Sequence, residues 1–156
     1  MSRRSLFGAG TLLAAAAAVP EIAGAQTQSS KALAPDAENI IRQHYRAWDR
    51  RDWHAEDMLL ADDFTFSSAA GDDHIPKNVF KTRCWDNNVN DIKGFDLLHV
   101  FGSGNEALVM YDCLTMDNKT FRNVEYLRVG GGKLEEIVCY FGATANYPAA
   151  VSARKA

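Results

Sequence analysis

The sequence predicts a single α+β domain in which helices cover one face of a curved sheet. In its first half, apolar residues recur at helical spacing, whereas the second half holds four alternating runs separated by the turn signals "GSGN", "DN" and "GGG". The 156 residues are 47% hydrophobic and 24% charged, which is ordinary for one globular domain with a proper core. A second domain does not fit into this length.

The first predicted helix runs from Pro35 to about Arg50. Proline suits a first helical position, and the acids Asp36 and Glu38 are favourable in the first turn of a helix because of its dipole. Five residues then follow helical spacing and mark the face that turns inward: Ala37, Ile41, His44, Tyr45 and Trp48. We therefore expect His44 and Tyr45 near the buried face of this helix.

Two shorter helices and a strand are expected next. Asp52 can cap a helix over Trp53 to Leu60, and the stretch "DDFTFSS" alternates as a strand does. A third helix should begin near Pro76, after a loop over Asp72–His74 in which Asp73 helps to cap it. The apolar side of that helix consists of Ile75, Val79, Phe80 and Cys84.

Four strands complete the predicted domain, and the short connections between them predict an antiparallel meander. The strands run over Ile92 to Phe101, Ala107 to Met116, Lys119 to Val129, and Lys133 to Thr144. The third of them, "KTFRNVEYLRV", carries Glu125 in its middle. Glutamate is depleted in strands and seldom fully buried without a partner, so Glu125 either faces water or lines an interior site.

The N-terminus predicts a signal peptide over residues 1–25. Two arginines precede an apolar run from Leu6 to Val19 and a small-residue end, Ala23 to Ala25. The start "SRRSLF" resembles the twin-arginine signal of bacterial export, which implies a folded cargo in the periplasm or outside the cell. The apolar run is too short for a membrane span. We expect a linker at 26–34, the domain at 35–144 and a disordered tail at 145–156.

Charge and motifs exclude several classes of function. The net charge is −3, and the basic residues are interleaved with acids, whereas nucleic-acid binding needs clustered Lys and Arg. Cys84, Cys113 and Cys139 form no CxxC pair, so we expect them to be small buried residues, although a disulfide stays open in an oxidising compartment. No second cluster completes a metal site with Asp72–His74, and no nucleotide or flavin motif occurs, so we expect neither a metal nor another cofactor.

Three long stretches resemble the SnoaL-like family of the nuclear transport factor 2-like superfamily, in a bacterial subgroup of unassigned function. They are "HYRAWDRRDWHAEDMLLADDFTF", "DDHIPKNVFKTRCW" and "KTFRNVEYLRVGGGKLEEIVCYFG". The resemblance implies a cone, in which the sheet wraps around the long helix and leaves an apolar pocket at its open end. The superfamily includes ketosteroid isomerases, dehydratases, epoxide hydrolases and polyketide cyclases, while other members only bind a ligand or a partner protein.

The isomerase pattern, matched on "RRDW" and "LADDF", falls on this chain as follows. The first-helix tyrosine position falls on His44, with Tyr45 beside it, the general-base position on Ser68, and the second acid on Glu125. The isomerase mechanism needs both a carboxylate base and a neutral acid. Because Ser68 cannot replace that base, we do not expect steroid isomerisation.

The same match implies that Glu125 points into the pocket, among mostly apolar walls that favour the protonated form of a carboxyl group. It then serves as an acid or a base, or it is a structural acid bonded to Asn123, Tyr45 or a backbone amide. His44 and Tyr45 are the further catalytic candidates. The expected ligand contacts are Asn123, Phe121, Trp48, His74, Trp85, Cys139 and Phe141.

Two functions therefore stay open. The chain is either an exported enzyme that performs acid/base chemistry on a small apolar molecule, or a non-catalytic ligand-binding or dimeric structural module. In both cases we expect a homodimer through the outer face of the sheet. That face is predicted to carry Val124, Tyr126, Val138 and Tyr140, which alternate with the pocket residues.

Overall fold

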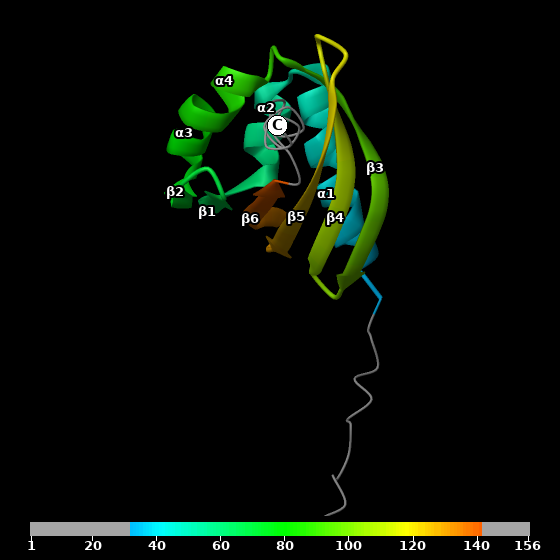
Figure 1. The fold of residues 1–156 in the computed structure, drawn as a ribbon. Helices are drawn as coiled ribbons and strands as arrows, with labels where there is room; N and C mark the ends of the chain where they lie inside the picture. The colour runs from blue at the N-terminus through cyan, green and yellow to red at the C-terminus, as the bar shows by residue number, and fades with distance from the viewer. Residues whose placement is uncertain (1–31, 142–156) are drawn as a thin grey trace, which may run out of the picture.

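A curved six-stranded sheet wraps around the long helix α1, Pro35–Arg50, in the computed structural model, which describes residues 32–141 (Figure 1). The shorter helices lie across the concave side of the sheet, opposite its long strands. The α+β class predicted from the sequence is confirmed. The hydrophobic core of the domain lies between α1 and the inner face of the strands, where Ile41, Phe64 and Leu127 have at most 1% of their surface exposed.

The first two helices form where the sequence predicts them. α1 ends when Arg51 adopts the left-handed conformation and its N–H bonds back to the last turn. α2, Trp53–Leu59, is capped by Asp52, whose Oδ1 accepts a hydrogen bond of 3.0 Å from the N–H of Ala55. The inward face of α1 includes His44, Tyr45 and Trp48, as its spacing predicts.

The third helical segment is irregular. α3, Lys77–Phe80, runs into a π-helical turn, η1, Lys81–Trp85, and then into the short α4, Asp86–Asn88. Its start one residue after Pro76 confirms the prediction, but the predicted capping role of Asp73 is wrong. Pro76 is the N-cap without a side-chain bond, and Asp73 instead contacts the ring of His74. The cause is that the preceding residues are extended as a strand.

The sheet has the order β2-β1-β6-β5-β4-β3. The last four strands form the predicted antiparallel meander. The strand bounds are β1 Leu60–Ser68, β2 Asp72–Pro76, β3 Ile92–Ser103, β4 Glu106–Thr115, β5 Thr120–Gly130 and β6 Lys133–Phe141. One feature differs from the prediction: β2 replaces the expected loop and pairs with β1. The sequence analysis made no prediction for the partner of β1, which runs parallel to β6.

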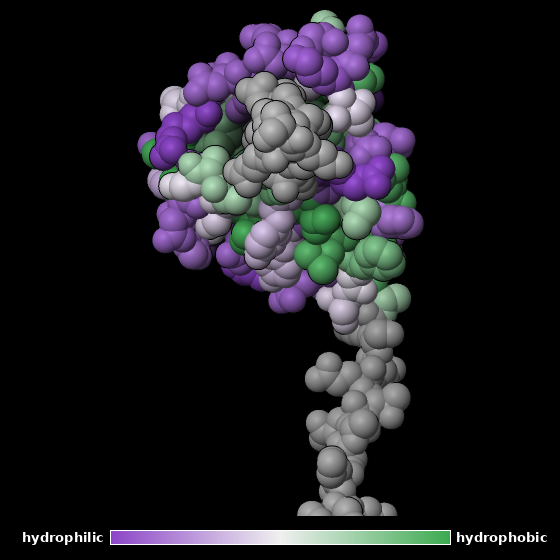
Figure 2. Space-filling view, in the orientation of Figure 1, coloured by the Kyte–Doolittle hydropathy of each residue, from purple (hydrophilic) through white to green (hydrophobic). Residues whose placement is uncertain are grey.

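Side chains alternate along β5 as predicted. Asn123, Glu125 and Leu127 are buried on the inner face, whereas Val124 and Tyr126 point to the outer face and are only half-buried. The middle of the outer face is apolar over β4, β5 and β6, where Leu108, Tyr126 and Val138 stand side by side in register. Figure 2 shows hydrophobic residues gathered on the surface over β4 and β5.

Several sequence predictions lie outside the described residues. They are the signal peptide at 1–25, the tail at 145–156, most of the 26–34 linker and the last residues of the fourth predicted strand. At the near end of the linker, Leu33 forms an isolated bridge with Gly104, and the N–H of Ala34 donates to the carbonyl of Gly104. Within residues 32–141, none of the helices combines the length and the apolar character that a membrane crossing requires.

Candidate functional site

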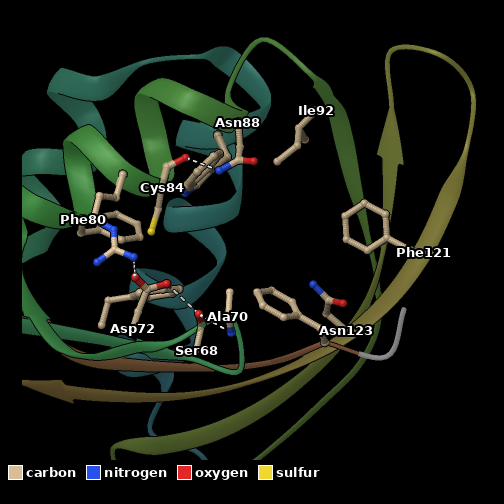
Figure 3. Close-up of a pocket in the computed structure, with 13 residues that line it drawn as sticks. Ser68, Ala70, Asp72, Phe80, Cys84, Asn88, Ile92, Phe121 and Asn123 are labelled. Atoms are coloured by element: carbon tan, nitrogen blue, oxygen red, sulfur yellow. Dashed lines mark hydrogen bonds and ion pairs between the residues drawn. The ribbon is translucent and has the colours of Figure 1, made fainter. Parts of the chain in front are cut away.

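A pocket of about 470 Å³ lies between the α3–η1–α4 segment and the inner face of the sheet (Figure 3). Most of its wall is apolar and aromatic, as is typical of small-molecule sites. Asp72, Ser68 and Cys84 lie on one side of it and Asn123 and Phe121 on the other. The lining residues are Trp48, Phe66, Ser68, Ala70, Asp72, Phe80, Arg83, Cys84, Asn88, Ile92, Phe121, Asn123 and Phe141.

An acid and a base form an ion pair in the pocket wall. Oδ1 of Asp72 lies 2.8 Å from Nη2 of Arg83, and Oδ2 of Asp72 accepts a hydrogen bond of 2.7 Å from the hydroxyl of Ser68. The Asp72 side chain is only 8% exposed, whereas that of Arg83 is 54% exposed. Asp72 is thus held from two sides, on the wall of an apolar cavity.

Local backbone irregularities bring these groups together. The pairing of β1 with β2 shifts register between Phe66 and Ser68, and Ser68 then stands opposite Asp72. On the facing element, the π-helical turn places the consecutive residues Arg83 and Cys84 on the pocket wall. Single π-turns inside helices occur frequently at functional sites.

Cys84 is a neutral group in this wall. Burial and, to a smaller extent, the nearby charge of Asp72 raise the pKa of its thiol to about 11, and Arg83 opposes the rise only in part. A thiol that keeps its proton at neutral pH is a poor nucleophile. The charge of the lining residues that the structure describes is therefore carried by Asp72 and Arg83.

Glu125 lies behind the pocket rather than on its wall. It is 8% exposed, and both of its carboxyl oxygens accept hydrogen bonds from tyrosines. The hydroxyl of Tyr45 lies 2.6 Å from Oε2, and the hydroxyl of Tyr111 lies 2.9 Å from Oε1. Nδ2 of Asn123, which does line the pocket, donates to the Tyr111 hydroxyl at 3.3 Å. Glu125 is thus connected to the pocket wall by hydrogen bonds through Tyr111 and Asn123.

Both tyrosines act as hydrogen-bond donors here. Burial raises the pKa of Tyr45 and of Tyr111 well above 10, and the charge of Glu125 raises both further. Their hydroxyls therefore keep their protons across the physiological range and hold the Glu125 side chain in place. Of the alternatives that the sequence leaves open, this geometry matches the structural acid bonded to Tyr45.

His44 forms a second buried pair, with a partner that the sequence reasoning missed. Its Nδ1 lies 2.7 Å from Oε1 of Glu56, and the two residues are 3% and 0% exposed. Burial lowers the pKa of His44, but the charge and hydrogen bond of Glu56 raise it more, with a smaller contribution from Glu125, so the net shift is upward. The available signal was the position of Glu56 three residues after Trp53, which places both residues on one face of the predicted helix.

The predicted ligand contacts separate into two groups. Trp48, Phe121, Asn123 and Phe141 line the pocket. The other three do not: Trp85 packs behind Trp48, with ring centroids 4.4 Å apart, Cys139 lies next to Asn123 and Tyr111, and His74 is exposed beside Asp73.

The sequence reasoning did not select Asp72, Arg83 or Asn88 as pocket residues. Asp72 was assigned to a loop, because Asp72–His74 was considered only as a metal site and no second cluster completes such a site. Cys84, Cys113 and Cys139 are free thiols.

Comparison with known structures supports the fold. A protein from Kribbella flavida DSM 17836 superposes with a TM-score of 0.63 at 23% identity, covering 75% of this chain and 94% of that one. An NTF2-like protein of unknown function from Mesorhizobium loti gives 0.60 at 20% identity, covering 72% and 99%. A LEH-like epoxide hydrolase from M. tuberculosis gives 0.55 at 16% identity, covering 68% and 82%. At these identities the likeness concerns the fold alone.

At the level of sequence, no curated protein matches the chain. A family model does match: that of the SnoaL-like domain aligns with residues 41–137, from the middle of α1 to the middle of β6. This match covers more than half of the chain and includes most of the pocket wall. The chain therefore belongs to the SnoaL-like domain family, whose fold is NTF2-like.

Proposed function

We propose that the chain is an exported enzyme that performs acid/base chemistry, of the isomerase, dehydratase or hydrolase type, on a small and mainly apolar molecule. One observation carries the proposal. A nearly buried carboxylate, Asp72, is paired with the guanidinium of Arg83 in the wall of an apolar pocket of about 470 Å³. A proton acceptor and a fixed positive charge on one cavity wall are the groups that proton transfer beside a substrate oxygen requires.

Asp72 and Arg83 have complementary roles in such a reaction. Asp72 takes a proton from one atom of the bound molecule and returns it to another, so an isomerisation needs no co-reactant. Arg83 stabilises the negative charge that develops on a substrate oxygen while the proton is away. Ser68 fixes the carboxylate by its hydrogen bond to Oδ2. Asp72 thus takes the place of the base that the isomerase pattern would have at Ser68.

Glu125, Tyr45 and His44 act here as positioning residues. Glu125 accepts from Tyr111, and Tyr111 accepts from Asn123, so this chain of bonds orients the Asn123 amide at the pocket wall. Tyr45 holds the other oxygen of Glu125, and His44 packs edge-on against Tyr45 with ring centroids 4.9 Å apart. The amide of Asn123 is thereby held as a fixed polar group on the pocket wall, facing the substrate.

The proposed reaction is tested by proton exchange. The purified protein is incubated in D₂O with 3-cyclohexen-1-one and with cyclohexene oxide, and solvent exchange, double-bond migration and ring opening are followed by NMR. Asp72→Asn should lower any such rate at least a hundredfold. Asp73→Asn is the matched control, because Asp73 is adjacent but has 88% of its side chain exposed outside the pocket. Equal rates in the Asp72 variant and the parent would refute the role of Asp72.

A second candidate function is ligand binding without turnover. It is favoured by the fact that both oxygens of Asp72 are already engaged, by Ser68 and by Arg83. A structural ion pair would look the same in the absence of substrate. The test is a thermal-shift screen of a library of small apolar molecules. If some of them bind but none shows proton exchange or turnover, the second function, ligand binding without catalysis, is supported.

A further inference from the structure

The charged groups of the pocket are balanced. Of its 13 lining residues, one is an acid, Asp72, and one is a base, Arg83, and they contact each other at 2.8 Å. Ser68, Asn88 and Asn123 are neutral polar groups, and the other described lining residues are apolar or, in the case of Cys84, a protonated thiol. The described wall therefore carries no net charge.

From this balance we infer that the Asp72–Arg83 pair sets the charge selectivity of the pocket, and that its substrate is a neutral molecule with an oxygen function, such as an alcohol, ketone or epoxide. The inference rests on the proposed function, because it takes this pocket as the substrate site.

An ion of either sign would be disfavoured in this pocket. A carboxylate that approaches Arg83 meets the carboxylate of Asp72, whose Oδ1 is 2.8 Å from the same guanidinium. An ammonium group that approaches Asp72 meets Arg83 for the same reason. In both cases the entering charge stays without a counter-charge beside an apolar wall, and this costs free energy.

A neutral oxygen avoids this cost. A guanidinium has five N–H donors, and the contact with Asp72 involves Nη2. A carbonyl or hydroxyl oxygen can accept from another N–H of Arg83 while the ion pair stays intact. The apolar body of the ligand then lies against the aromatic wall, which includes Trp48, Phe80 and Phe121.

The experiment uses three probes with the same apolar body and different charge: 2-naphthalenemethanol, 2-naphthoate and 2-naphthylmethylammonium. Their affinities are measured at pH 7 by calorimetry, and the NMR shift of the Trp48 indole N–H reports binding in the pocket. The parent should bind the alcohol at least tenfold more tightly than either ion. Asp72→Asn leaves the wall positive and should improve naphthoate binding about tenfold, whereas Arg83→Gln should improve binding of the ammonium probe.

Two control variants change charge nearby without lining the pocket. They are Asp73→Asn and Lys81→Gln, whose native side chains contact His74 and Asp86. Neither should alter the preference among the probes. The inference is overturned if the parent binds an ion as tightly as the alcohol, or if both pocket variants shift the two ions in the same direction. Failure of all three probes to bind the parent would instead refute the pocket as a small-molecule site and the proposed function with it.

Discussion

The hydroxyl of Tyr45 on α1 lies 2.6 Å from Oε2 of Glu125 on β5, a contact between residues 80 positions apart in the sequence. It ties the central helix to the middle of the sheet directly behind the pocket. Tyr111 holds the other oxygen of Glu125 from β4, so three elements meet at one carboxyl group. We expect this meeting point to matter both for stability and for the orientation of Asn123.

Removing the Tyr45 hydroxyl should destabilise the fold. Tyr45→Phe keeps the ring but leaves one buried oxygen of Glu125 without its donor, which costs about 1 to 3 kcal/mol. Urea denaturation at pH 7 measures the change in the free energy of unfolding. Tyr140→Phe is the control and should change it by less than about 0.5 kcal/mol, because Tyr140 is 58% exposed. Equal stability of the Tyr45 variant and the parent would show that the contact contributes nothing.

Replacing Glu125 by Gln should also destabilise the protein, by about 1.5 to 3 kcal/mol. The parent carboxyl group accepts from two tyrosine hydroxyls, whereas an amide offers one acceptor oxygen and turns an N–H toward the other hydroxyl. Denaturation at pH 5 and pH 8 compares the two proteins. A Gln variant as stable as the parent at pH 8 would show that the two hydrogen bonds to the carboxyl group do not stabilise the fold.

His44 should make stability depend on pH. Its pKa in the folded state is raised, because Glu56 outweighs the lowering effect of burial. The stabilisation is therefore fully present below the unfolded value of about 6.5 and is lost as pH rises through the higher folded pKa. Denaturation from pH 5.5 to 9 should show this decline in the parent.

The matched variants for that measurement are His44→Gln and His54→Gln. The first leaves Glu56 buried without its partner and should cost about 3 kcal/mol at pH 6, with a flatter pH profile. The second changes an exposed histidine on α2 and should keep the parent profile. If the parent and the His44 variant show the same slope with pH, the buried pair is not the source of the dependence.

The sequence was sufficient for most of the fold because its signals are local. The spacing on α1, the cap at Asp52 and the alternation along β5 each depend on neighbouring residues. The side of β5 that Glu125 occupies was expected from the family resemblance, because the alternation alone left both sides open. Tyr45 was among the predicted partners of Glu125, but Tyr111 was not, because Tyr111 meets Glu125 only through the register of β4 with β5. Asp72 was missed for a similar reason: its place in the pocket depends on β2 pairing with β1 and on the shift in that pairing before Ser68.

The outer face of the sheet should mediate a homodimer. Leu108 is 47% exposed in register with Tyr126, and Tyr126 stands beside Val138. Leu108→Asp places a charge in the middle of this apolar surface and should raise the dimer dissociation constant at least a hundredfold, which sedimentation velocity at micromolar concentration would detect. Met58→Asp, at a residue that is 60% exposed on α2, is the control. A parent protein that sediments only as a monomer would refute the proposed dimer.

Export should depend on the paired arginines of the N-terminus. Changing Arg3 and Arg4 together to Lys should retain the precursor in the cytoplasm if the twin-arginine route is used. Fractionation of a bacterial host, followed by immunoblotting of precursor and mature forms, measures this. Unchanged export of the double variant would assign the protein to the general secretory route.

β6 has a strand on each side: the parallel neighbour β1 on one and β5 on the other. As the chain emerges from the ribosome, β1 and β2 can pair with each other early, but they join the rest of the sheet only when the last strand is in place. The cavity wall formed by Ser68 and Asp72 therefore meets the wall formed by Asn123 and Phe141 late in folding. A chain that stops before Lys133 lacks β6, so β1 and β2 stay separate from β3, β4 and β5, and no closed pocket forms. Ligand binding in this pocket would therefore require that the whole domain has been synthesised and folded.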